Sequence, residues 1–591
     1  MRRPQLKSAA CLTLLMAGSL ACGTAVITET ALERGVVAAP EAQAAEVGAA
    51  ILRKGGNAVD AAIAVQFAIS VTNAIGAGLG GGGFMLIHDP VTGDVVALDY
   101  RETAPAAAHR DMFLDENGTV DHELSLHSAL ASGVAGTVRG MAAAHARYGS
   151  LPWADLIQPA IDLAENGFEI DPWTAGSFTK YGEKFAVLDE RFREQIEFRL
   201  YFSGGSGDRL KIPDLAATLR RIAEEGPDEF YTGRTAQMIV EEMERGGGSI
   251  TAEDLAGYEV EWREPSESDY RGHRIVSMSP PSSGGVILIE FLNMLETLER
   301  LPLHSPGQIH LVAEVAKRVF ADRAEYLGDP AFADVPFEVL SDKAYARARA
   351  AGIDVAVRTD PQTLTAGDLP LAKAGDGQTT HFSIVDRNGM AVSNTTTMNT
   401  GYGSGLVVDG AGFLLNNQMN DFSAKPGVPN VYGVTGSAAN EIAPGKRPLS
   451  SMTPTMVFDP EGNLELVLGS PGGPTIITSV LEVILHVVDY ERPLAEAVDL
   501  PRFHHQWPPP TPGADPISIE TDDGYTLPSE TIEALLRMGY TLDERESLGD
   551  VQAVEIEGRR VTGVFDRRRT GGVEYDRERP VQASGTNRRE E

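Results

Sequence analysis

Cysteine is nearly absent from this sequence of 591 residues, and basic side chains are scarce. Only two cysteines occur, Cys11 and Cys22. Both fall within the first 22 residues, so the remainder of the chain can form no disulfide. The 84 acidic side chains outnumber the 50 basic ones, which gives a formal net charge of −34. Binding to nucleic acid needs a basic face, so this balance argues against DNA or RNA as a partner.

Long hydrophobic runs are also lacking beyond the N-terminal segment. No other apolar stretch approaches the roughly 20 residues that a membrane-spanning helix needs. Residues 1–22 combine two early arginines with an apolar core over residues 9–21, which is typical of a secretory signal peptide. We therefore expect an exported protein, periplasmic or secreted. A lipid anchor on Cys22 is the alternative, although Ser19 at the third position before it fits that motif poorly.

Signatures of cofactor and metal sites are missing as well. The sequence has no P-loop, no H-E-x-x-H and no G-x-S-x-G. Residues 78–83 formally satisfy G-x-G-x-x-G, but they follow a predicted helix and precede a predicted strand, the reverse of a dinucleotide site. His504 and His505 are adjacent, so they point to opposite faces of an extended segment. That placement favours a structural role over metal binding, and we expect no cofactor.

Periodicity and punctuation predict the other elements of the chain. Residues 133–325 are mainly helical, with one strand-like run at 273–278. Shorter elements are expected as helices over 39–55, 57–74 and 475–488, and as strands over 84–88, 95–100, 412–415, 454–458 and 464–468. Residues 354–378 lack an apolar period and are interpreted as an exposed linker. The end of the chain from Asp566, rich in arginine and acidic residues, is predicted to be a disordered tail.

A β-hairpin predicted over residues 379–397 is the centre of the sequence argument. Gly375 and Gly377 form a loop with little conformational preference before it. Apolar residues then alternate along the segment, and Arg387-Asn388-Gly389 supplies the turn. Thr379 is therefore expected to begin a buried strand.

Thr379 is an unusual residue to begin such a strand. A threonine hydroxyl is a poor nucleophile unless a base lies beside it. If the bond between Gln378 and Thr379 were cleaved, the freed α-amino group, with a pKa of roughly 7.7–8.0, would be that base. The segment thus allows two interpretations, a self-cleaving N-terminal-threonine hydrolase or an ordinary hairpin with a polar first strand.

Motifs along most of the chain favour the first interpretation. From about Val36 to about Phe565 the sequence resembles the γ-glutamyltranspeptidases, on the motifs at residues 80–85, 99–105, 280–285, 379–386, 397–399, 415–422, 446–455 and 469–473. The resemblance implies an α+β fold, the four-layer αββα sandwich of N-terminal-nucleophile hydrolases. It also implies a precursor that divides after a signal peptide (1–22) into a large subunit (23–378) and a small catalytic subunit (379–591).

The same resemblance implies roles for particular residues. Thr379 is the nucleophile, Thr397 holds it in position, and cleavage separates Gln378 from Thr379. A free amino-acid head requires sites for an ammonium and for a carboxylate. The matching positions are Asn399, Gln418 and Asp421 for the ammonium, Arg101, Ser450 and Ser451 for the carboxylate, Gly472 and Gly473 for the oxyanion hole, and Tyr432 in a lid loop over residues 427–437.

The implied activity is transfer of a γ-glutamyl group from compounds such as glutathione to water or to an amino-acid or peptide acceptor. The two subunits would form a heterodimer from one precursor. Two enzymes of the same fold remain as alternatives, a cephalosporin (glutaryl) acylase and a poly-γ-glutamate hydrolase. An exported amino-acid or peptide binding protein that is never cleaved is the alternative from another class.

Overall fold

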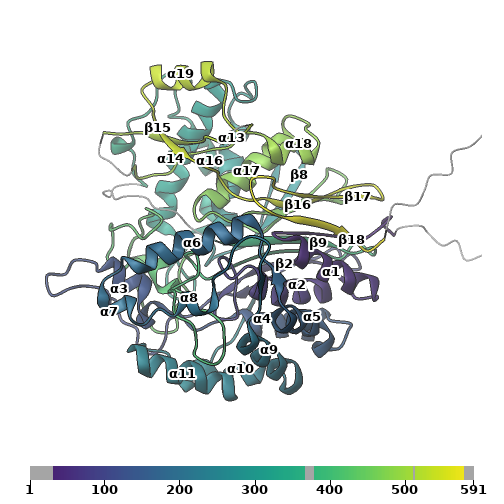
Figure 1. Cartoon of the computed structure of the whole chain (residues 1–591). Helices are drawn as coiled ribbons and strands as arrows, with labels where there is room; N and C mark the ends of the chain where they lie inside the picture. The colour runs from purple at the N-terminus through teal and green to yellow at the C-terminus, as the bar shows by residue number, and fades with distance from the viewer. Residues whose placement is uncertain (1–30, 367–378, 510–512, 523, 578–591) are drawn as a thin grey trace, which may run out of the picture.

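Two β-sheets lie face to face at the centre of the molecule, and helices cover the outer face of each (Figure 1). The computed structural model describes residues 31–366, 379–509, 513–522 and 524–577. The predicted signal peptide and Gln378 lie outside these described residues. None of the helices in these ranges is both long and apolar enough to cross a membrane.

The first sheet has seven strands and contains the predicted hairpin. All of its neighbouring strands are antiparallel. Their order across the sheet is β18 (Gly572–Tyr575), β1 (Val36–Ala39), β9 (Thr380–Val385), β10 (Ala391–Thr397), β2 (Gly82–His88), β3 (Val95–Tyr100) and β6 (Glu261–Arg263). The hairpin strands β9 and β10 are therefore central.

The second sheet has six strands, again all antiparallel. Their order is β17 (Arg560–Phe565), β16 (Gln552–Glu557), β12 (Leu464–Gly469), β11 (Thr455–Phe458), β8 (His273–Ser277) and β7 (Ser266–Tyr270). Two small sheets lie outside this pair and consist of β13 (Phe503–His504), β14 (Pro516–Glu520) and β15 (Thr541–Arg545), and of β4 (Phe168–Glu169) and β5 (Arg209–Leu210).

The strands are buried on both faces because their apolar residues divide between two cores. In β2, Phe84 and Leu86 belong to the core between the sheets. Met85 and Ile87 pack with the helices beneath the sheet. Since successive side chains of a strand point to opposite faces, one short apolar run serves both cores, and strands β11 and β12 divide their side chains in the same way.

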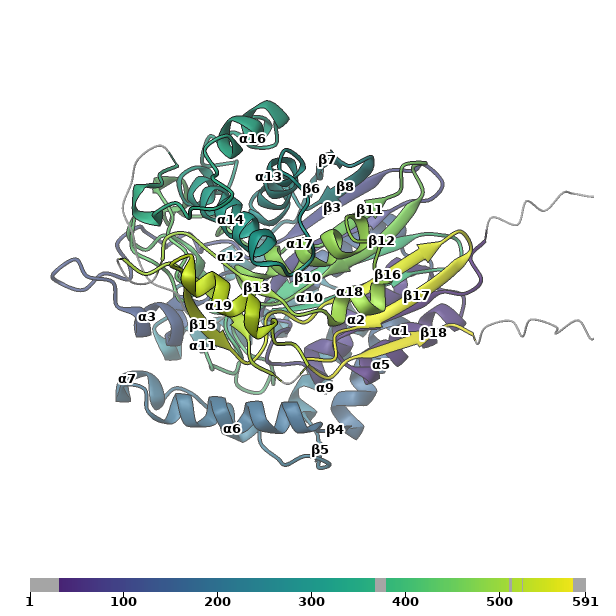
Figure 2. The same cartoon turned by 90° about the horizontal axis from the view of Figure 1, so that it is seen from above.

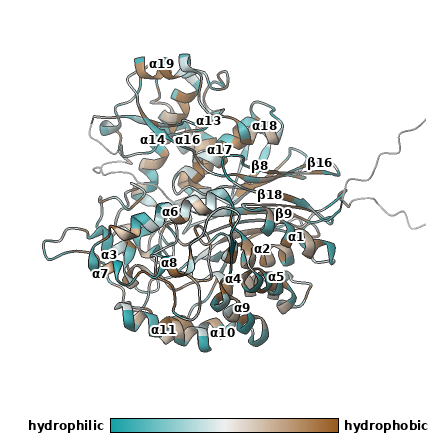
Figure 3. Cartoon of the chain, viewed as in Figure 1, coloured by the Kyte–Doolittle hydropathy of each residue, from teal (hydrophilic) through white to brown (hydrophobic). Residues whose placement is uncertain are grey.

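Helices on the outer face of the seven-stranded sheet come mostly from the first half of the chain. They are α1 (Ala42–Arg53), α2 (Ala58–Thr72), α4 (Thr137–Tyr148), α5 (Trp153–Asn166), α6 (Pro172–Ala186), α8 (Phe198–Tyr201), α9 (Pro213–Glu225), α10 (Asp228–Thr232), α11 (Arg234–Gly246) and α12 (Ala252–Ala256). The short helices α3 (His122–His127) and α7 (Glu190–Arg193) lie outside this core. At the periphery, α11 is apolar on its inner side and hydrophilic on its outer side (Figure 3). The helix α2, in contrast, is buried along its whole length and begins at the capping box of Asn57 and Asp60.

Helices over the six-stranded sheet come from both sides of the predicted cleavage point. They are α13 (Gly284–Glu296), α14 (Pro306–Tyr326), α15 (Phe337–Leu340), α16 (Lys343–Ala350), α17 (Thr475–Val488), α18 (Leu494–Asp499) and α19 (Ser529–Arg537). Short 3₁₀ turns occur at η1 (Ala129–Ala131), η2 (Pro361–Thr363), η3 (Gln418–Asp421) and η4 (Ala438–Asn440). The two predicted subunits therefore share one core.

Several predicted elements are confirmed, and others need correction: residues 133–325 contain four strands, β4 to β7, besides the predicted run, and the first helix begins at Ala42. The strand over 95–100 and the helix over 475–488 have the predicted bounds. Residues 412–415 form no strand and make only isolated bridges. Gly410 and Gly412 have φ of 68° and 73°, and a left-handed backbone interrupts an extended run. The linker is not wholly exposed, because Pro361 is buried and its carbonyl accepts a hydrogen bond from Trp507 Nε1 at 2.9 Å.

The expected disorder of the C-terminal tail is also wrong for its first part. Residues 572–575 form β18, which pairs with β1 and lies beside β17 in both views (Figures 1 and 2). The Arg34 guanidinium lies 3.3 Å from the centroid of the Tyr575 ring, and the Asp576 carboxylate accepts from the Gly35 N–H. These contacts order a segment that its polar composition alone would leave without a core.

Candidate active site

Two threonine hydroxyls meet where the central hairpin opens. Thr379 directly precedes β9, and Thr397 ends the neighbouring strand β10. Their Oγ1 atoms are 3.4 Å apart, and both side chains are buried. Thr397 Oγ1 also accepts a hydrogen bond from the Asn399 N–H at 2.9 Å. Thr397 is therefore fixed by the backbone in a position to orient the Thr379 hydroxyl.

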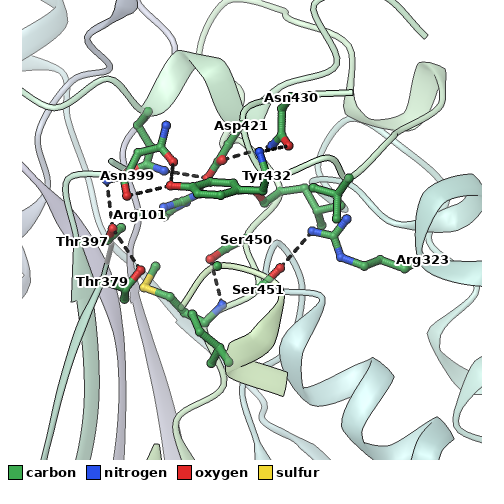
Figure 4. Close-up of a pocket in the computed structure, with 16 residues that line it drawn as sticks. Arg101, Arg323, Thr379, Thr397, Asn399, Asp421, Asn430, Tyr432, Ser450 and Ser451 are labelled. Carbon is green, nitrogen blue, oxygen red and sulfur yellow. Dashed lines mark hydrogen bonds and ion pairs between the residues drawn. The ribbon is translucent and has the colours of Figure 1, made fainter. Parts of the chain in front are cut away.

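A polar pocket opens beside these hydroxyls and gathers nearly all of the predicted site residues (Figure 4). They come from the end of β3, from η3, from the loop before β11 and from the turn after β12. The pocket is lined by Arg101, Arg323, Thr379, Thr397, Asn399, Gln418, Asp421, Asn430, Tyr432, Val434, Leu449, Ser450, Ser451, Met452, Gly473 and Ile476. Among the predicted residues that the structure describes, Gly472 alone does not line this pocket, and it lies instead in the wall of a larger cavity.

Arg101 is held rigidly at the base of the pocket. Its side chain is fully buried, and its Nη2 lies 2.5 Å from Asp421 Oδ2. Nε donates to the Pro448 carbonyl at 3.3 Å, and Nη1 is 3.6 Å from Glu102 Oε2. Burial raises the pKa of the Asp421 carboxyl, and the Arg101 guanidinium opposes that rise. The guanidinium is therefore positioned before any ligand arrives.

Asp421 receives further hydrogen bonds from neutral amides. Gln418 Nε2 donates to its Oδ2 at 2.6 Å, and Asn430 Nδ2 donates to its Oδ1 at 3.4 Å. Donors directed at both oxygens favour the ionised carboxylate. This end of the pocket is thus a negative site surrounded by polar groups, which suits a substrate ammonium.

Tyr432 lines the pocket and lies against Asn399. Its hydroxyl donates to the Asn399 carbonyl at 2.7 Å and also contacts Asn399 Oδ1. Burial raises the pKa of Tyr432 well above 10, so the hydroxyl remains a donor at neutral pH. Asn399 itself has φ of 78°, a left-handed conformation that asparagine tolerates better than most residues. The ring separates the pocket from a larger cavity of about 840 Å³ that Tyr432 also lines.

Two serines and an arginine form the wall opposite Asp421. Arg323 Nη2 donates to Ser451 Oγ at 3.1 Å, and Arg323 Nε donates to Ser283 Oγ at 2.9 Å. The Ser283 hydroxyl in turn donates to the Ser450 carbonyl at 2.6 Å. Arg323 is not recognisable as a site residue from the sequence, because an arginine within a long helical pattern such as that of α14 is typical of a solvated charge.

Gly472 and Gly473 lie between β12 and α17, with φ of 132° and 60°. A side chain is unfavourable at both positions. A Cβ on Gly472 would also lie 2.3 Å from Thr475 Oγ1. Gly473 precedes the first turn of α17 and lines the pocket that contains Thr379. Backbone N–H groups at a helix N-terminus stabilise negative charge, so this turn suits a developing oxyanion.

The adjacent histidines bond to different partners. His504 Nδ1 lies 2.9 Å from Thr478 Oγ1, and His505 Nε2 lies 2.7 Å from Asp515 Oδ1. Burial lowers the pKa of His504 to about 4, which keeps it neutral. Within the described ranges, no group of three or more histidine, cysteine or acidic side chains is arranged to hold a metal ion.

Comparisons with known proteins point to one family. The profile described as Gamma-glutamyltranspeptidase matches residues 44–575. The chain is 44% identical over 565 residues to a glutathione hydrolase proenzyme of Pseudomonas aeruginosa, covering 95% of this chain and 98% of that one. It is 44% identical over 530 residues to the glutathione hydrolase proenzyme of Escherichia coli, covering 89% and 88%. The cephalosporin acylase structure from Bacillus halodurans matches with a TM-score of 0.79 and 26% identity, over 97% and 99% of the two chains.

Proposed function

The chain belongs to the gamma-glutamyltranspeptidase family, and from this membership and the pocket geometry we propose how its residues carry out the reaction. It is a glutathione hydrolase that is made as a proenzyme. The observation that carries the residue assignments is the pocket itself. Paired threonine hydroxyls lie beside a buried Arg101 and Asp421, which suit the two charged groups of an amino-acid head.

We assign the layered arrangement to the αββα sandwich of N-terminal-nucleophile hydrolases. Support comes from the two facing sheets with helices outside each. A nucleophile at the start of a central strand has its hydroxyl held by the adjacent strand. Once the bond before Thr379 is cleaved, its freed α-amine can act as the base for its own hydroxyl.

Maturation begins when the Thr379 hydroxyl attacks the carbonyl carbon of Gln378. The amide nitrogen leaves with a proton and becomes the α-amine of Thr379, and the acyl group moves to Oγ1 as an ester. Water then hydrolyses the ester, which restores the hydroxyl and gives Gln378 a free carboxylate. A large chain (23–378) and a small chain (379–591) result, and the shared core around α14 and α17 holds them together as a heterodimer.

The mature enzyme repeats this chemistry on its donor. The α-amine of Thr379 takes the hydroxyl proton as Oγ1 attacks the γ-carbonyl, and Thr397 positions the hydroxyl. The backbone N–H groups of Gly472 and Gly473 stabilise the oxyanion, an effect worth roughly 2.7–4 kcal/mol for a donor of this kind. The amine of the donor takes that proton from the Thr379 α-amine and leaves. Water or an acceptor amine then attacks the γ-glutamyl ester on Thr379.

Donor recognition follows from the charges of the pocket. Arg101, Ser450 and Ser451 receive the α-carboxylate, and Asn399, Gln418 and Asp421 receive the α-ammonium. Between these two anchors the γ-carbonyl is directed to Thr379. The leaving amine and the acceptor would occupy the large cavity beyond Tyr432, which Gly472 also lines. Tyr432 therefore separates the donor pocket from the acceptor side.

A glutaryl acylase is the second candidate, because the Bacillus halodurans structure with this fold is a cephalosporin acylase. A glutaryl group lacks the α-ammonium that Asp421 would bind, so the charge of Asp421 favours a γ-glutamyl donor. A poly-γ-glutamate hydrolase remains a third candidate. Membership of an enzyme family argues against the hypothesis of an uncleaved binding protein. We also propose export to the periplasm or the medium, on the sequence of residues 1–22.

The test combines intact mass with donor choice. Purified wild-type protein should give two chains, the smaller beginning at Thr379, and should cleave a γ-glutamyl anilide much faster than a glutaryl anilide. Thr379→Ala should remain one inactive chain. A Thr379→Ala variant that is still processed would overturn the nucleophile assignment, and a preference for the glutaryl anilide would replace the proposed donor.

A further inference from the structure

Arg323 is a buried cation at the donor pocket that has no ion-pair partner among the described residues. It lies on α14, is buried, and projects toward the pocket wall (Figure 4). In the described ranges its side chain donates hydrogen bonds to two neutral hydroxyls, those of Ser283 and Ser451. No carboxylate lies within 4 Å of its nitrogens there. Buried charges in proteins are usually paired, so an anion bound in the pocket would stabilise this guanidinium.

The acid that could neutralise Arg323 is already occupied. Asp421 contributes to its electrostatics, and burial nevertheless lowers the pKa of Arg323 to about 10. Asp421 is in direct contact with Arg101 instead, at 2.5 Å. Arg101 thus has two carboxylates nearby, those of Asp421 and Glu102. No carboxylate of the described residues contacts Arg323, and an incoming anion would supply that missing negative charge.

The hydrogen bonds of Arg323 also fix the direction of a serine proton. A guanidinium can only donate, so Ser451 Oγ is the acceptor in their contact. In the described part of the chain the Ser451 hydroxyl has no protein acceptor for its own proton. Because Ser451 lines the pocket, that proton is available to an oxygen of the substrate.

The second bond of Arg323 fixes the neighbouring serine. Ser283 Oγ accepts a hydrogen bond from Arg323 Nε, and its own hydroxyl donates a hydrogen bond to the carbonyl of Ser450. The N–H of Ser283 donates to the same carbonyl at 2.8 Å. One side chain thus holds both pocket serines, Ser450 through its backbone and Ser451 through its hydroxyl.

We propose that Arg323 is a positioning residue for donor recognition, which turns the Ser451 hydroxyl toward the substrate α-carboxylate and supplies a second positive charge to that carboxylate. The inference rests on the proposed function, because it takes the γ-glutamyl head as the ligand of this pocket. It goes beyond that function because it makes Arg323, which bonds to the pocket serines, a determinant of selectivity for donors that carry an α-carboxylate.

The test compares two donors that differ only in this group. One is a γ-glutamyl anilide, and the other is its α-carboxamide, which keeps the ammonium but lacks the carboxylate. Arg323→Gln should raise the KM for the first donor about 10- to 100-fold, the range of a charge-assisted hydrogen bond. Its kcat should change far less. The preference of wild-type enzyme for the carboxylate donor should be mostly lost.

Arg318→Gln is the matched control, because Arg318 lies on the same helix, is equally buried, and bonds to Glu314 away from the pocket. It should keep the wild-type preference between donors. Ser451→Ala should reproduce the KM effect of Arg323→Gln, and the double variant should be little worse than either. Arg323→Lys, which keeps the charge, should restore part of the preference even if Arg323→Gln fails to mature.

The outcomes separate the two proposals. If wild-type enzyme does not cleave the γ-glutamyl anilide, the proposed function fails. If wild-type enzyme cleaves it but both Arg323 variants keep the wild-type ratio between the two donors, the role of Arg323 is refuted. Equal losses for both donors would also refute it, since they would indicate general damage to the site.

Discussion

The Arg101 guanidinium and the Asp421 carboxylate form a buried ion pair, with 2.5 Å between Nη2 and Oδ2. These residues are 320 positions apart in the sequence, and the proposed function assigns them to opposite charges of the donor. Both side chains have lost most of their water before a donor arrives. The donor head would therefore insert two charges next to a preformed pair, so the removal of either partner should affect folding as well as binding.

Asp421→Asn should be costly in both respects. Loss of one partner leaves a buried guanidinium, which typically costs about 3–5 kcal/mol of stability. The KM for a γ-glutamyl anilide should rise by at least about tenfold, because the ammonium loses its charged partner. Urea denaturation and steady-state kinetics measure the two effects. As a control, Asp409→Asn breaks the exposed pair with Arg245 and should change stability by less than about 1 kcal/mol.

Thr397→Val tests whether the second threonine positions the first. Valine keeps the shape of the side chain but removes the hydroxyl that lies 3.4 Å from Thr379 Oγ1. Both maturation and turnover should slow by up to about 100-fold, since a misplaced nucleophile loses its attack geometry. Intact mass against time and kcat measure this. Thr397→Ser keeps the hydroxyl and should stay close to wild type; a fast-maturing valine variant would contradict the assignment.

Tyr432→Phe should weaken donor binding through Asn399. The substitution removes the hydroxyl that bonds to the Asn399 carbonyl at 2.7 Å. We expect a stability loss of about 1 kcal/mol and a KM that rises several-fold while kcat changes little. Tyr490→Phe removes a comparable bond, to the Leu301 carbonyl at 2.8 Å and away from the pocket. It should show a similar stability loss with no change in KM, and a KM effect in both variants would argue against a local role.

The sequence located most of the pocket because its residues fall in short motifs. The hairpin at Thr379 could also be derived from alternation and turn chemistry alone. Arg323 was missed for a physical reason, since its function depends on contacts with Ser283 and Ser451, 40 and 128 residues away. The pairing of Arg101 with Asp421 was missed for the same reason, because single-residue roles do not reveal which charges touch.

Glu102 should give stability a pH dependence of known sign. Burial raises its pKa from 4.5 to about 7, against the opposing charge of Arg101. Between these values the folded state holds a proton that the unfolded state releases, so this contribution to stability falls as the pH rises from 4.5 to 7 and is constant above. Glu102→Gln should remove that fall, which is on the order of a few kcal/mol.

Denaturation midpoints at pH 5 and pH 8 check this expectation. The variant should gain stability relative to wild type at the higher pH, and the exposed substitution Glu264→Gln should follow wild type at both. If the Glu102→Gln and wild-type midpoints changed in parallel, Glu102 would not titrate in this window.

Tyr575 offers a test of the strand that the sequence analysis interpreted as part of a disordered tail. Its ring lies under the Arg34 guanidinium, 3.3 Å from centroid to Cζ, and its hydroxyl accepts from the Gly563 N–H at 3.2 Å. Tyr575→Ala should therefore lower the free energy of unfolding by about 1–3 kcal/mol. The substitution should also loosen the active site, because β18 covers the edge of β1, and β1 pairs with the strand that follows Thr379.

Glu574→Ala is the control, since the Glu574 side chain makes no hydrogen bond or ion pair among the described residues. If urea denaturation found both variants equal to wild type, residues 572–575 would not contribute to the stability of the fold.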